Sequence, residues 1–94
     1  MTDREIINQV GAPALFEGIA EEAVELAKAA LKVARIMRKE NPTPVTLDEA
    51  AREVVVEYSD LRVYLDILRI LVDAEVYDDK KQRFIERLKE GSEE

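Results

Sequence analysis

The chain has 94 residues, a formal net charge of −7 at pH 7, and neither cysteine nor histidine. Such a length allows one domain. The two missing residue types exclude disulfides, thiolate chemistry, histidine general bases and zinc sites built on sulfur or nitrogen. A metal site in this chain would have only oxygen ligands, which favour Mg²⁺, Mn²⁺ or Ca²⁺.

The charge and the apolar pattern also argue against two kinds of partner. Binding to a nucleic-acid duplex needs a basic face, which an acidic chain lacks. The apolar runs are too short to span a bilayer, and Met1-Thr2-Asp3-Arg4 does not open a signal peptide. We therefore expect no membrane contact and a cytoplasmic location.

Glycine and proline divide the chain into four predicted helices. Gly11-Ala12-Pro13 separates a short helix near 3–10 from a long one near 13–40, because proline suits a first helical turn. The prolines of segment 41–44 end the long helix. Thr46 and Glu49 form a capping box that begins a helix near 46–74. A softer break near 75–78 precedes a helix near 77–90.

The elements predict an all-α fold in which residues 1–90 form one helical domain. Gly91 begins a polar C-terminal tail, residues 91–94, which we expect to fray. No segment alternates with period two for long enough to predict a strand.

The helix near 46–74 is apolar around most of its circumference. At about 100° per residue its polar side chains gather in one narrow arc, made of Arg62, Asp66, Arg69 and Asp73. Glu57 and Asp60 fall on the opposite, apolar side. One layer of helices from so short a chain cannot cover this surface, so we expect a homodimer or a dimer of dimers.

The helix near 13–40 carries a second pair of carboxylates that do not lie within its polar face. Its polar, solvent-facing side (here called the wet face) carries six charged residues: Glu17, Glu21, Lys28, Lys32, Arg35 and Lys39. Glu22 lies across from that face, and Glu25 lies at its border. The members of each pair, Glu22 with Glu25 and Glu57 with Asp60, are three residues apart and share a helix face.

These two pairs predict a metal site. An ionised carboxylate in apolar surroundings is costly, and the basic residues of both helices lie mainly on the wet faces. Carboxylates that converge from antiparallel helices would also repel one another, and a divalent cation resolves both problems. The alternative is a pair of ordinary solvated faces, since Glu-x-x-Glu spacing is common in a chain that is 37% charged.

The same residues carry a family resemblance. Glu21-Glu22-Ala23-Val24-Glu25, followed by Glu57-Tyr58-Ser59-Asp60, resembles the EExxE…ExxD signature of the MazG-like, all-α nucleoside triphosphate pyrophosphohydrolases. The proline segment 41–46, the helix start at 49–52 and the basic segment 80–88 resemble small phage-type and Firmicute-type members. The likeness covers nearly the whole chain, although the 31 residues between Glu25 and Glu57 exceed the family's common spacing.

The resemblance implies a four-helix bundle with two long antiparallel helices. It also implies Mg²⁺-dependent hydrolysis of a nucleoside triphosphate to a monophosphate and pyrophosphate, as nucleotide-pool housekeeping, with Mn²⁺ as a substitute. The metal ligands carried over are Glu22, Glu25, Glu57 and Asp60. Candidates for other roles are Glu21 or Glu53 for orienting the water, Lys80 and Arg83 for phosphate contacts, and Tyr64 for stacking on a base.

Other interpretations stay open. Lys80 and Arg83 are equally well explained as solvated charges, and Tyr64 as a packing residue. A non-catalytic helical oligomerisation or regulatory module would explain the apolar third helix as well as an enzyme dimer does. A Ca²⁺ sensor is a poor fit, because the chain lacks the acidic 12-residue loop with its glycine.

Overall fold

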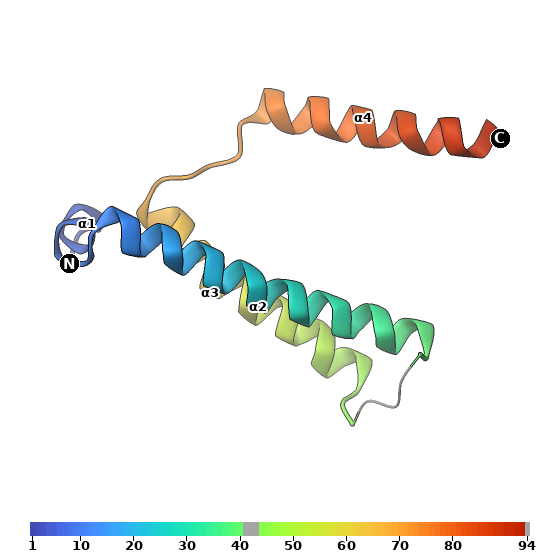
Figure 1. The fold of residues 1–94 in the computed structure, drawn as a ribbon, viewed down its shortest axis with the longest axis horizontal. Helices are drawn as coiled ribbons and strands as arrows, with labels where there is room; N and C mark the ends of the chain where they lie inside the picture. The colour runs from blue at the N-terminus through green and yellow to red at the C-terminus, as the bar shows by residue number, and fades with distance from the viewer. Residues whose placement is uncertain (41–43, 94) are drawn as a thin grey trace.

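The computed structural model describes residues 1–40 and 44–93. They form four α-helices in the order α1 (Asp3–Val10), α2 (Ala12–Arg38), α3 (Leu47–Ile67) and α4 (Ala74–Glu93) (Figure 1). No strand occurs in these two described ranges, which confirms the all-α class predicted from the sequence.

Capping and turn residues set the starts of the first three helices. Thr2 caps α1, since its hydroxyl accepts a hydrogen bond from the Glu5 backbone N–H at 3.1 Å. Gly11, with φ of 94°, turns the chain between α1 and α2. Thr46 caps α3 in the same way, accepting from the Glu49 N–H at 3.1 Å. The proposed helix stop at Asn41, Pro42 and Thr43 lies outside the described residues.

The end of α3 corrects the predicted helix near 46–74. The helix stops at Ile67, and Arg69 takes a left-handed conformation with φ of 57°. The N–H of Ile70 donates to the Leu65 carbonyl at 2.8 Å, and the N–H of Arg69 donates to the Asp66 carbonyl at 3.0 Å. This is the hydrogen-bond pattern of a Schellman cap, formed here without glycine.

The start of α4 corrects the position predicted for Asp73. Its carboxylate accepts from the Val76 N–H at 3.1 Å, and its carbonyl accepts from the Tyr77 N–H at 2.8 Å. Asp73 is therefore the N-terminal cap of α4 rather than part of a polar arc on α3. At its other end α4 continues through Glu93, past the tail predicted from Gly91.

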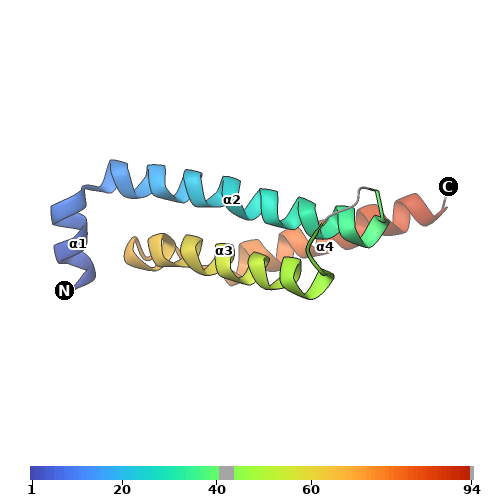
Figure 2. The ribbon, with the colours of Figure 1, turned by 90° about the horizontal axis from the view of Figure 1, so that it is seen from below.

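The core lies between α2 and α3, which run antiparallel and side by side while α1 crosses one end of the pair (Figure 2). Only four residues in the described ranges are buried: Leu15, Gly18 and Ala29 from α2 and Ala50 from α3. Three of these four are Gly or Ala, and such small residues allow two helix backbones to approach closely.

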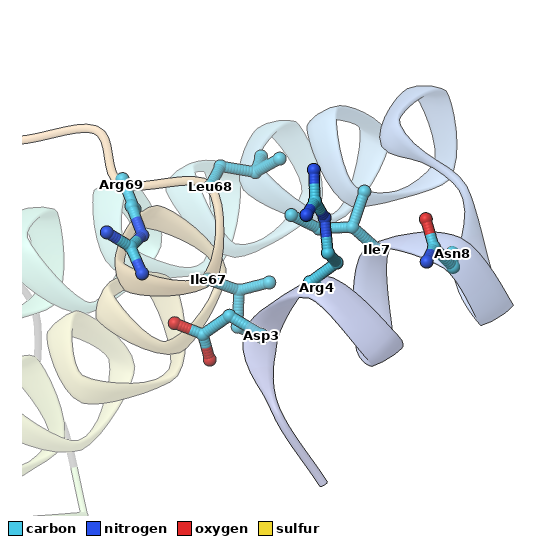
Figure 3. Close-up of a pocket in the computed structure, with 7 residues that line it drawn as sticks. All are labelled: Asp3, Arg4, Ile7, Asn8, Ile67, Leu68 and Arg69. Carbon is cyan, nitrogen blue, oxygen red and sulfur yellow. The ribbon is translucent and has the colours of Figure 1, made fainter.

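A pocket of about 520 Å³ lies where α1 meets the end of α3. Figure 3 shows Asp3, Arg4 and Ile7 of α1 facing Ile67 and Arg69 across it. None of the residues predicted to bind metal or substrate lines this pocket. This pocket lies at the contact between α1 and the C-terminal cap of α3.

Helix α4 stands apart from the rest of the chain. An extended segment joins it to α3 (Figure 1), and within the described residues it contacts none of the other helices. Hence one chain does not close into a four-helix bundle. The Cα radius of gyration is 17.5 Å, against about 12 Å for a compact domain of this length. Over the described residues, no helix has the length and apolar character needed to cross a membrane.

We predict that Gly18→Ala destabilises the protein. A methyl group at Gly18 would lie 2.6 Å from Cζ and 2.8 Å from Cδ1 of the Tyr64 ring, well inside contact distance. Such overpacking costs about 1–3 kcal/mol, which outweighs the gain of up to about 1 kcal/mol from alanine's helix propensity. Urea denaturation should therefore show a lower free energy of unfolding.

Gly91→Ala is the matched control, because nothing lies within 4 Å of a methyl group added there. It keeps the helix-propensity gain without the clash, so it should stabilise α4 slightly. If both variants changed stability by the same amount, the contact between Gly18 and Tyr64 would not limit the approach of α2 and α3.

Candidate metal centre

Three carboxylates converge between α2 and α3. Glu22 from α2 and Glu57 and Asp60 from α3 each place a carboxylate oxygen within 4.8 Å of the other two. We call these residues the carboxylate triad. Ligands of one octahedral Mg²⁺ at about 2.1 Å are at most about 4.2 Å apart. Small side-chain movements would therefore let all three oxygens bind one hard cation.

Sequence spacing on each helix explains the convergence. Leu15, Gly18, Glu22 and Ala29 are spaced by three, four and seven residues, so Glu22 lies in line with the buried residues of α2. On α3, Glu57 lies seven residues after buried Ala50 and seven before Tyr64, whose ring packs on Gly18. The carboxylates consequently occupy the middle of the α2–α3 contact.

The pKa of Glu57 is raised by its neighbours in this site. A hydrogen bond with the Glu53 side chain, partial burial, and the charges of Glu53, Asp60 and Glu22 together raise the pKa of Glu57 above its usual value. The same neighbours therefore disfavour the ionised form of Glu57 when no cation is bound. A bound divalent cation would supply positive charge there.

The carboxylates of the triad are less buried than the apolar surroundings predicted from the sequence would make them. Glu22 and Glu57 are half-buried, and Asp60 is exposed. Since the chain supplies only two helices at this place, water reaches the triad from the side. Desolvation of the three carboxylates is therefore only partial, and a cation would also offset their mutual repulsion.

Glu25, predicted as a fourth metal ligand, is not brought into the triad. Its carboxylate forms an ion pair with the Lys28 amine at 3.3 Å. It lines a pocket of about 390 Å³ beside the triad, together with Lys28, Ala29, Lys32, Arg35, Glu53 and Glu57. We call this the α2–α3 pocket.

The basic side chains of this pocket were missed by the sequence argument. Lys32 and Arg35, which we placed on the wet face, are half-buried and lie beside Glu53 and Glu57. The signal was available, because Lys32 is seven residues after Glu25 and so shares its helix face.

The other predicted site residues lie in different settings. Glu53 reaches Glu57 and the α2–α3 pocket, whereas Glu21 is exposed and outside the triad. Tyr64 packs against Gly18. Lys80 and Arg83 are on α4, where Arg83 pairs with Asp79 at 3.2 Å. Because α4 does not contact α2 or α3, neither basic residue reaches the triad of its own chain.

Comparison of the chain with protein-family models, with curated proteins and with solved structures finds no match. The function of the chain is therefore inferred from its sequence pattern and from the geometry of the carboxylate triad.

The raised pKa of Glu57 predicts a pH dependence of stability. The folded state holds this proton more tightly than the unfolded chain, so protonation stabilises the fold. That contribution is complete below the usual value of about 4.5 and is lost as pH rises through the raised pKa. Metal-free protein should therefore lose stability relative to Glu57→Gln as pH rises above about 4.5 and through the raised pKa, as followed by melting temperature. Parallel profiles for the two proteins would contradict the prediction.

Proposed function

We propose that this chain is a Mg²⁺-dependent nucleoside triphosphate pyrophosphohydrolase, with a role in nucleotide-pool housekeeping. The observation that carries the proposal is the approach of Glu22, Glu57 and Asp60 to within 4.8 Å of one another from two antiparallel helices. The resemblance of these positions to the MazG-like signature supports the same assignment. Mn²⁺ would substitute for Mg²⁺, since both accept a set of oxygen ligands.

The reaction consumes one water. The water oxygen bonds to the α-phosphorus, the bond from that phosphorus to the oxygen bridging to the β-phosphate breaks, and the products are a nucleoside monophosphate and pyrophosphate. When bound, the metal would polarise the phosphate oxygens and offset their charge. In this chain Glu53 is better placed than Glu21 to orient the water, because it hydrogen-bonds Glu57 beside the triad.

A panel of nucleoside triphosphates tests the proposal directly. We expect pyrophosphate release with Mg²⁺ or Mn²⁺ and none with excess chelator. Mg²⁺ should also raise the melting temperature of the protein, because a ligand that binds only the folded state stabilises it. Absence of both effects at millimolar Mg²⁺ would overturn the assignment.

We also propose that the chain works as a homodimer or a dimer of dimers. Its accessible surface is 7668 Å², roughly 2,200 Å² more than a compact monomer of this mass exposes. Obligate dimers bury about 2,000–5,000 Å² in total over both copies. The excess surface of each chain is therefore the amount that such an interface would remove.

Helix α4 is the strongest candidate for this contact. Tyr77 and Phe84 lie seven residues apart on one face of α4 and are 53% and 59% exposed. Exposed apolar side chains also cover α2 and α3: Phe16, Val24, Leu31, Met37, Val55, Val56, Tyr58 and Val63. Contact with a second copy would remove these apolar side chains from water.

The second candidate function is a non-catalytic oligomerisation or regulatory module. The same exposed apolar surface favours it, because assembly alone would explain that surface. The nucleotide panel separates the two candidates, since only the enzyme releases pyrophosphate in a metal-dependent reaction.

A further inference from the structure

Two basic side chains that line the α2–α3 pocket, Lys32 and Arg35, form no ion pair with the carboxylates around them in the described part of the chain. Lys28, in contrast, pairs with Glu25. Lys32 and Arg35 are both half-buried. A cation in that position has lost part of its hydration and gains from an anion that enters the pocket.

Lys32 and Arg35 lie in a pocket that adjoins the carboxylate triad. Glu57 belongs to the triad and also lines the α2–α3 pocket, so the pocket begins where the candidate metal site ends. From Glu25 to Arg35 the pocket follows α2 for ten residues, which is about 15 Å along the helix axis. An elongated anion that starts at the triad would run past Lys32 toward Arg35.

We propose that Lys32 and Arg35 form a polyphosphate subsite beside the carboxylate triad. The ligand class is a pyrophosphate or triphosphate group in complex with a divalent cation. The cation lies against the triad and the outer phosphates against the two basic side chains. The guanidinium of Arg35 binds phosphate oxygens in a two-pronged manner, and the amine of Lys32 binds as a point charge.

This inference rests on the proposed function for its substrate, but it assigns the phosphate contacts to residues other than those expected from the sequence. Lys80 and Arg83 lie on α4, away from their own chain's triad. Lys32 and Arg35 belong to the same two-helix unit as the triad. A single chain therefore supplies both the carboxylates and the phosphate contacts.

Calorimetric titration with Mg²⁺-pyrophosphate tests the subsite. We expect the wild-type protein to bind this probe, and Lys32→Ala/Arg35→Ala to weaken binding roughly 10- to 100-fold, as expected for lost hydrogen bonds to charged groups. Arg35→Lys should bind better than Arg35→Ala. Arg38→Ala is the control, because Arg38 is 72% exposed, pairs with Glu40 and lies outside the pocket.

Three results would overturn the subsite. They are no pyrophosphate binding by wild-type protein that does bind Mg²⁺, unchanged binding by the double variant, or an equal loss in Arg38→Ala. A metal-free melting temperature that falls in the double variant while its pyrophosphate affinity holds would instead make both residues structural partners of Glu53 and Glu57. Failure of the proposed function is distinguishable, because it abolishes the Mg²⁺-dependent melting shift and hydrolysis in wild-type protein.

Discussion

Asp60→Asn should abolish metal-dependent hydrolysis while leaving the metal-free protein folded. The substitution keeps the shape of the side chain and removes one of three converging negative charges. Loss of even an outer-shell partner weakens metal binding by about 10- to 100-fold, so loss of a direct ligand should exceed that. Melting with and without Mg²⁺, beside a hydrolysis assay, measures both effects.

The stability of the metal-free variant is the more discriminating result. Asp60 forms no ion pair within the described part of the chain, so its neutralisation leaves no base without a partner. Repulsion of Glu22 and Glu57 falls, and the melting temperature should hold or rise. A variant that melts much earlier without metal, yet hydrolyses nucleotide normally, would contradict the proposed site.

Asp66→Asn is the control on the same helix. Asp66 is exposed and pairs with Arg62 on the opposite side of α3 from the triad. An exposed pair of this kind is worth less than about 1 kcal/mol. The control should therefore retain Mg²⁺ binding and hydrolysis and lose little stability.

Phe84→Asp should dissociate the proposed homodimer or dimer of dimers. Phe84 is 59% exposed on α4, and α4 contacts no other helix of the described chain. Burial of such a side chain contributes about 1.5–3 kcal/mol, and a symmetric dimer contains it twice. The dissociation constant should therefore rise roughly 100- to 10,000-fold, as measured by sedimentation over a range of protein concentrations.

Gln82→Asp introduces the same charge on the other side of α4. Its cost should be a few tenths of a kcal/mol, from repulsion of Glu86 one turn away, with the assembly retained. A wild-type chain that sediments as a folded monomer at micromolar concentration would contradict the proposed assembly. Equal dissociation of both variants would move the interface away from the face of α4 that bears Phe84.

Local signals predicted most of the helix boundaries correctly. Thr46 begins α3 because a hydroxyl at that position satisfies a backbone donor that the helix cannot. The predicted end of the third helix was wrong, because the apolar pattern continues through Ile70, Leu71 and Val72. In addition, no glycine marks the cap at Arg69. Helical periodicity alone cannot distinguish that segment from another two turns of helix.

Three of the four residues predicted as metal ligands lie close together, and their role as ligands stays a prediction. Glu22, Glu57 and Asp60 meet, whereas Glu25 pairs with Lys28 on its own helix and lines the neighbouring α2–α3 pocket. Lys32 and Arg35 were not predicted to line the α2–α3 pocket, because a helical wheel does not show which neighbouring helix covers a face. The seven-residue spacing from Glu25 to Lys32 was the one signal in the sequence that placed these two residues on the same face.

The isolation of α4 has a consequence for how the protein folds. The contacts that hold α1, α2 and α3 together form within one molecule, so this part can fold at a rate independent of concentration. In the proposed assembly, docking of α4 onto another copy would be a second-order step, and its rate would fall as the protein is diluted. Until such docking occurs, the exposed Leu71, Val72 and Phe84 side chains would favour aggregation. Yield on refolding should therefore depend on a balance between correct pairing and aggregation, both of which become faster with concentration.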